Sequence, residues 1–213
     1  MALQIKKEVT NLYEEGIQCL RSGNFTEAIT ILRLAIGIDP EHANAHAALC
    51  LAAHEAGEHD LIQISAMKLI DLPNRCARQL ATSVSYYDGG FYEDAIKIIE
   101  ESIRLCPHEA LSYYILGRAQ LALFKFKEAQ ASFLKACELA SDFAVARSLL
   151  TWLATYLSVD ESERIPLLMN VSRVPMHQPP PDIRDMTKYP FTQDSLDDLY
   201  GNVSFFYGAG NEI

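Results

Sequence analysis

Histidine and cysteine side chains recur along one segment at a spacing that could bind a metal ion. His42, His46, Cys50 and His54 stand four residues apart, so on a helix they share one slowly drifting face. The sharper zinc-helix motif is not completed, because the run from His54 to His59 is one residue too long. We therefore predict packing roles for His46 and Cys50 and no metal site.

The other polar residues form no recognisable catalytic motif. The sequence has no glycine-rich phosphate loop and no nucleophile elbow, and 88–90 (Asp-Gly-Gly) has the composition of a turn between helices. The carboxylate pairs at 14–15 and 100–101 are typical of solvated helix surfaces. We expect a protein that is not an enzyme and that needs no cofactor.

The five cysteines lie 26–31 residues apart and form no CxxC pair. An odd number at these distances is typical of neither a disulfide framework nor a zinc knuckle. We interpret them as small buried side chains in a reducing compartment: Cys19, Cys50, Cys76, Cys106 and Cys137.

The chain of 213 residues carries 28 acidic and 18 basic side chains, a net charge of −10. Its basic residues are scattered, whereas nucleic-acid binding needs a basic surface, so we expect no nucleic-acid partner. The N-terminus becomes charged before an apolar signal segment could form. The longest mostly apolar stretch, Leu149 to Val159, is shorter than the roughly 20 residues that span a bilayer. We therefore expect a cytoplasmic protein without membrane insertion.

A repeat organises the elements that carry these side chains. A small residue recurs at intervals of 34, 33 and 34 residues, at Gly16, Cys50, Ser83 and Gly117. In three copies an aromatic residue and an alanine follow at fixed distances: Phe25 and Ala28, Tyr92 and Ala95, Phe126 and Ala129. The small residues allow helices to approach closely, the aromatic ring fills the gap, and a proline ends each of the first three copies. The second copy is the weakest.

This pattern resembles the tetratricopeptide repeat, a helix-turn-helix unit of 34 residues. The resemblance covers about residues 9–142 and implies an all-α fold, an α-solenoid wound as a right-handed superhelix. We expect repeats at 9–42, 43–75, 76–109 and 110–142, with helix pairs 9–22 and 25–38, 43–56 and 59–71, 76–88 and 92–105, 110–123 and 126–139. An apolar helix at 143–158 would cap the exposed end and complete a repeat domain over 1–158.

The resemblance also implies a concave groove lined by the first helix of each unit. The lining predicted from the register is apolar and aromatic: Tyr13, Ile17, Leu20, Leu51, His54, Leu80, Val84, Tyr87, Tyr114, Arg118 and Leu121. Family members that grip the acidic tails of heat-shock chaperones use lysine, asparagine and arginine there. The matching positions here, including Tyr13, Ala48 and Ala81, provide no cation, which argues against that function.

The last part of the chain, 159–213, has a different composition. It holds six of the nine prolines, and 179–181 favours an extended polyproline stretch. It also carries large apolar side chains that disordered tails seldom have: Tyr189, Phe191, Leu199, Tyr200, Phe205, Phe206 and Tyr207. Three roles stay open, namely packing on its own domain, docking onto a partner or a second copy, and disorder.

These patterns favour a non-enzymatic adaptor or scaffold that binds a protein segment, peptide or helix, in its groove and docks through its tail. The alternative is a dedicated chaperone of a hydrophobic client, similar to the small acidic tetratricopeptide chaperones of bacterial type III secretion.

Overall fold

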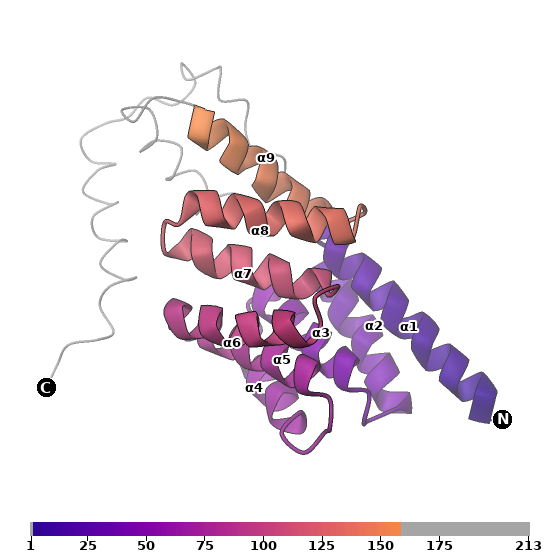
Figure 1. Ribbon diagram of the computed structural model, residues 1–213. Coiled ribbons are helices and arrows are strands. Elements are labelled where there is room, and N and C mark those ends of the chain that lie inside the picture. Colours follow the sequence, from indigo (N-terminus) through magenta and orange to yellow (C-terminus); the bar gives the residue numbers. More distant parts are fainter. Residues whose placement is uncertain (1, 159–213) are drawn as a thin grey trace, which may run out of the picture. The chain divides into compact units, whose positions relative to one another are not determined.

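The computed structural model describes residues 2–158, and these contain nine helices and no strand. Figure 1 shows them stacked in chain order as pairs. The helices are α1 (Ala2–Ser22), α2 (Phe25–Ile38), α3 (Ala43–Ala56), α4 (His59–Lys68), α5 (Arg75–Asp88), α6 (Tyr92–Leu105), α7 (Ala110–Ala122), α8 (Phe126–Leu139) and α9 (Ala144–Ser158). The predicted tail, 159–213 with its docking residues, lies outside the described residues. No helix in 2–158 is both long and apolar enough to cross a membrane.

The all-α solenoid predicted from the repeat is confirmed, and most helix ends agree to within one residue. Two helices differ more. The first begins at Ala2 instead of residue 9, because no glycine or proline stands before Gly16 to stop it. The fourth ends at Lys68 instead of residue 71. Pro73 disfavours helix in the residue before it, and the guanidinium of Arg78 donates to carbonyl oxygens beyond the helix end.

The turns inside the four units share one backbone conformation. Gly23, Gly57 and Gly90 have φ angles of 88°, 76° and 81°, and Phe124 has 58°. These positions follow the repeat spacing. A left-handed residue lets the chain reverse directly between paired helices, and glycine adopts this conformation without steric strain. The fourth unit uses a phenylalanine at the same place.

Close helix approach at the small-residue position is confirmed. A Cβ atom added to Gly16 would lie 2.7 Å from the side chain of Leu32, and one added to Gly117 would lie 2.7 Å from the ring of Phe133. Cys50 and Ser83, which occupy the same position in the other units, are fully buried. The paired helices therefore depend on small side chains at this point for their spacing.

Helix α9 covers the end of the array. It packs on α8 and also reaches α1. Trp152 and Tyr156 are each 5% exposed and stack with their ring centroids 5.2 Å apart, and Tyr156 also contacts Phe126. The tryptophan is therefore a packing residue, as its place on a capping helix predicts.

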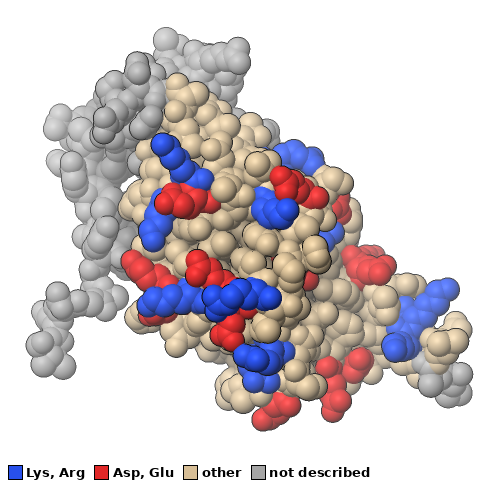
Figure 2. All heavy atoms as spheres, in the orientation of Figure 1, with Lys and Arg blue, Asp and Glu red and all other residues tan. Residues whose placement is uncertain are grey.

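The outer surface carries charges of both signs. Figure 2 shows basic and acidic side chains interspersed on the face where α6 and α8 lie. On α6, Lys97 pairs with Asp94 at 2.8 Å, and on α8, Lys135 pairs with Glu138 at 3.0 Å. These pairs are exposed, so they keep the surface solvated and add little to stability.

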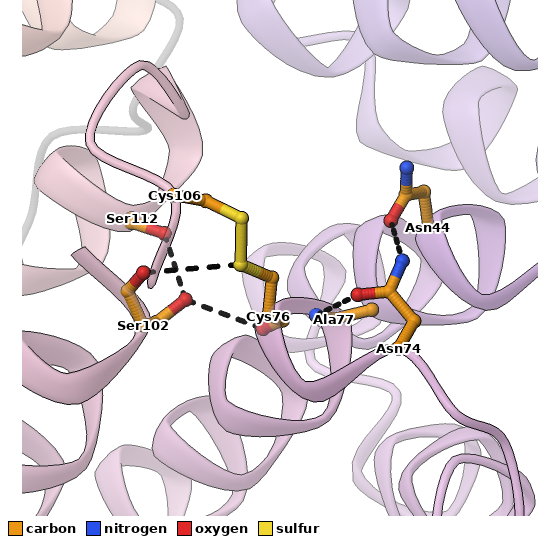
Figure 3. Close-up of a disulfide and its surroundings, with 7 residues drawn as sticks. All are labelled: Asn44, Asn74, Cys76, Ala77, Ser102, Cys106 and Ser112. Atoms are coloured by element: carbon orange, nitrogen blue, oxygen red, sulfur yellow. Dashed lines mark hydrogen bonds between the residues drawn. A yellow bond between two sulfur atoms is a disulfide. The ribbon is translucent and has the colours of Figure 1, made fainter. Parts of the chain in front are cut away.

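The prediction that all five cysteines are free is wrong for one pair. Cys76 and Cys106 form a disulfide, with their Cα atoms 6.3 Å apart (Figure 3). Cys76 stands at the start of α5 and Cys106 directly follows the end of α6. Because paired helices run antiparallel, these two ends meet in space. Cys19, Cys50 and Cys137 are free thiols.

Candidate binding surface

The side chains predicted to line a groove lie on the first helices of the four units, α1, α3, α5 and α7. Six of them are buried between helices: Ile17, Leu20, Leu51, Leu80, Val84 and Tyr114. The other five are only partly buried: Tyr13, His54, Tyr87, Arg118 and Leu121. Of the predicted lining, only this second set reaches the surface.

A buried ion pair joins three of the four units. A guanidinium nitrogen of Arg118 donates to Oε1 of Glu55 at 2.5 Å and to the hydroxyl of Tyr114 at 2.9 Å, and that hydroxyl donates to Glu55 at 3.0 Å. The guanidinium lies 5.5 Å from the ring centroid of Tyr87. Only 2% of the Glu55 side chain and 15% of the Arg118 side chain are exposed. Helices α3, α5 and α7 thus share one polar cluster.

The surroundings keep Arg118 charged and Tyr114 neutral. Burial opposes the charge of Arg118, but Glu55 and then the neighbouring tyrosines outweigh it, so the pKa of Arg118 is raised well above its ordinary value. Burial, followed by the charge of Glu55, raises the pKa of Tyr114. The guanidinium is thereby matched by a carboxylate of the same chain.

Two histidines converge on one carboxylate beside this cluster. Nδ1–H groups of His54 on α3 and His59 at the start of α4 donate to Oδ1 of Asp88 at 2.9 and 2.7 Å. The edge of the His54 ring meets Tyr87, with centroids 4.9 Å apart. Burial lowers the pKa of His54, and the nearby carboxylates only partly oppose this effect. His54 is therefore neutral at neutral pH, which suits its role as a hydrogen-bond donor.

The first and fourth units also face each other. Tyr13 on α1 lies 5.0 Å from the ring of His42, and burial followed by the charge of Glu109, before α7, raises the pKa of Tyr13. Near the end of α1, Arg21 pairs with Asp142 at 3.3 Å, in the turn that leads into α9. The array therefore curves enough to bring its first helix close to its last.

The remaining residues of the four-residue series have separate partners. His42 caps the first turn of α3, His46 donates to the carbonyl oxygen of Pro40 at 3.0 Å, and the thiol of Cys50 lies 3.6 Å from the carbonyl oxygen of Ile62. Within 2–158 no group of three histidine, cysteine, aspartate or glutamate side chains is arranged to hold a metal ion.

Sequence reasoning missed Glu55, Asp88 and His59. One signal was available for Asp88, because Tyr87 occupies the register of His54 in the next unit, 33 residues on, and Asp88 directly follows it. Side chains in equal register on adjacent first helices lie side by side. Glu55 and Arg118 are 63 residues apart, almost two units, and no local pattern predicts that contact.

Comparison with known proteins agrees with the geometry. The family profile described as tetratricopeptide repeat matches residues 19–42 and 110–143. The two matched segments are similar to tetratricopeptide repeats, and they support a tetratricopeptide repeat protein of unidentified type. No curated protein matches it significantly.

Several solved structures are similar to the chain. TTC0263, a thermophilic TPR protein of Thermus thermophilus, is 20% identical, with a TM-score of 0.50 over 83% of this chain and 94% of its own. Pseudomonas aeruginosa PilF is 19% identical, with a TM-score of 0.46 over 97% and 95%. Desulfovibrio magneticus MamA is 17% identical, with a TM-score of 0.42 over 78% and 94%. At 20% identity, the similarity to TTC0263 supports the fold alone.

Proposed function

We propose that the chain is a non-enzymatic adaptor that holds a segment of a partner protein against the concave side of its repeats. Tetratricopeptide repeat proteins are generally adaptors of protein interactions. The observation that carries the proposal is the partly exposed set on the first helices, which spans all four units: Tyr13, His54, Tyr87, Arg118 and Leu121.

The chemistry of this set favours an apolar or aromatic segment. Tyr87 presents a ring between His54 and Arg118, and Leu121 lies one turn beyond Arg118 on α7. Glu55 already balances the charge of Arg118, so an acidic segment would place a second negative charge beside a guanidinium that is already neutralised. Burial of apolar area would supply affinity at about 25 cal/mol per Å², reduced by the ordering of the segment.

The tail would supply a second contact, to the partner or to another copy of the chain. Its aromatic residues between Tyr189 and Tyr207 motivate this part of the proposal. Two contacts joined by a linker raise the overall affinity without a larger single interface.

The adaptor proposal is tested with Tyr87→Ala in the full-length chain. Partners are captured with the wild-type chain, and one captured protein is then titrated against each variant. We expect at least about tenfold weaker binding for Tyr87→Ala. Leu134→Ala is the matched control, because Leu134 is an exposed apolar residue on the second helix α8. Equal binding by wild type and Tyr87→Ala would contradict the proposal that the partner segment binds at these residues of the first helices.

One feature supports the chaperone alternative. Helix α4 and the turn after it expose Ile64, Met67 and Ile70 at 58%, 67% and 62%, whereas the outer face of α6 carries charged residues such as Lys97 and Arg104. A chaperone would use such a surface to shield an apolar client. The purified chain should then bind a hydrophobic dye, and Met67→Lys should reduce both dye binding and protection of the client from aggregation. A chain that binds no dye would contradict this alternative.

A further inference from the structure

We infer that the Cys76–Cys106 disulfide is a thiol–disulfide exchange site that fixes the seam between the third and fourth repeats when oxidised and loosens it when reduced. The disulfide joins the open ends of one helical hairpin, since α5 and α6 are already connected at their other ends by the turn at 89–91. Oxidation therefore closes the third repeat into a covalent ring. The inference does not rest on the proposed adaptor function.

The bond lies where two repeats meet. The hydroxyl of Ser102 on α6 donates to the carbonyl oxygen of Cys76 at 3.2 Å and lies 3.3 Å from the hydroxyl of Ser112 on α7 (Figure 3). Cys106 also begins the short linker to α7, which Glu109 ends by capping that helix. The disulfide thus anchors the linker at the point where the fourth repeat starts.

The start of α5 is anchored from the opposite direction as well. Asn74 caps α5 by accepting from the backbone N–H of Ala77 at 3.0 Å, and its amide donates to Asn44 on α3 at 2.9 Å (Figure 3). Reduction leaves these hydrogen bonds in place, so the third repeat keeps its contact with the second. The loss of order should therefore be confined to the linker side.

Both sulfur atoms suit reversible exchange. Cys76 and Cys106 are both partly exposed residues, unlike the cysteines of a disulfide in a closed core, from which a small thiol is excluded. Cys76 is the second residue of α5, and the positive end of a helix stabilises a thiolate there. This makes the sulfur of Cys76 the better leaving group and that of Cys106 the site of attack.

The reaction balances with a low-molecular-weight thiol such as glutathione. Its thiolate attacks Sγ of Cys106, a mixed disulfide forms, and the electron pair of the broken bond leaves on Sγ of Cys76. A second thiol attacks the mixed disulfide, which releases Cys106 and forms the small-molecule disulfide. Two thiols are oxidised and the protein disulfide is reduced. Oxidation by glutathione disulfide follows the reverse path.

The three other cysteines do not compete for this chemistry. Burial raises the pKa of Cys50 to about 12, and burial also raises the pKa values of Cys19 and Cys137. Since the thiolate is the reactive form, these thiols stay largely unreactive near neutral pH.

The test equilibrates the full-length chain with glutathione and glutathione disulfide at several ratios, then denatures it with an alkylating reagent and locates the label by mass spectrometry. In oxidising buffer only Cys19, Cys50 and Cys137 should be labelled, and in reducing buffer all five. Hydrogen exchange in 106–109 should be about tenfold faster in the reduced chain, while exchange in 43–46 of the second repeat stays unchanged.

Two variants sharpen the result. Cys106→Ser should exchange like the reduced chain in every buffer, and Cys137→Ser should respond like the wild type. Comparison of the oxidised with the reduced wild type keeps the test valid if Cys106→Ser does not fold. The proposal is overturned if Cys76 and Cys106 are labelled after oxidation, if glutathione cannot reduce the native chain, or if the linker exchanges equally in both states.

Discussion

Arg118 of the fourth repeat and Glu55 of the second form an ion pair 2.5 Å long across Tyr87 of the third. The pair skips one first helix, because Arg118 on α7 reaches Glu55 on α3 past Tyr87 on α5. Both side chains of the pair are largely shielded from water. The hydroxyl of Tyr114 donates a hydrogen bond to Glu55 and accepts one from Arg118. The curvature of three repeats is thereby tied to one buried contact.

Loss of one partner from this pair should strongly destabilise the fold. Arg118→Met leaves the carboxylate of Glu55 buried without its cation, and the free energy of unfolding should fall by about 3–5 kcal/mol. Arg75→Met is the matched control, because Arg75 pairs with Glu101 at the exposed surface, and its loss should change stability by less than about 1 kcal/mol. Urea denaturation measures both. Equal effects of the two substitutions would contradict the importance of the buried pair.

The double variant Arg118→Met with Glu55→Gln completes a double-mutant cycle, which measures the interaction free energy between the two side chains. Removal of both charges should restore part of the lost stability, because no buried charge then lacks a partner. Additive losses in the double-mutant cycle would mean that the two side chains act independently.

Stability should fall in mild acid because of His54. Its pKa is lower in the folded chain than in the unfolded chain, so the unfolded state binds the proton more readily as the pH falls. The contribution of neutral His54 is fully present above about pH 6.5, the unfolded value, and declines below it. Urea denaturation between pH 5 and 7 should show a smaller decline for His54→Gln than for the wild type. His108→Gln, at an exposed position, should retain the wild-type decline.

The fold could be predicted from the sequence because helix pairing follows a local rule repeated four times. Gly16 and Gly117 predict close approach, and the structure places side chains where a Cβ atom would otherwise lie. The disulfide was also within reach of this reasoning, since Cys76 and Cys106 begin and end one hairpin. The contact between Glu55 and Arg118 was not, because it depends on packing angles summed over two repeats.

Position 117, where Gly117 packs against the paired helix, should not tolerate even the methyl group of alanine. In Gly117→Ala the new Cβ atom would lie 2.7 Å from the fully buried ring of Phe133, and such overpacking costs about 1–3 kcal/mol. Gly37→Ala is the control within a helix, because no atom lies within 4 Å of its added Cβ. That change should stabilise the chain by about 0.5–1 kcal/mol. Thermal melts that moved both variants in the same direction would contradict the packing account.

The turn of the fourth repeat should gain stability from glycine. Phe124 adopts a left-handed φ of 58°, a conformation that is unfavourable for a residue with a Cβ atom by about 1–2 kcal/mol. Phe124→Gly should therefore raise the melting temperature, although it loses a ring contact with Phe126. Gly57→Ala, at the equivalent position of the second repeat, should lower it. A lower melting temperature for Phe124→Gly would show that the ring contact outweighs the backbone strain.

The proposed adaptor function is tested most directly by isothermal titration. The measurement compares the affinity of one captured partner for three full-length chains and one truncated chain. These are the wild type, Tyr87→Ala, Leu134→Ala and a chain that ends at Val159, each first shown to be folded by its melting curve. We predict at least about tenfold weaker binding for Tyr87→Ala and for the truncated chain, with no change for Leu134→Ala. Wild-type affinity in both Tyr87→Ala and the truncated chain would contradict the proposal.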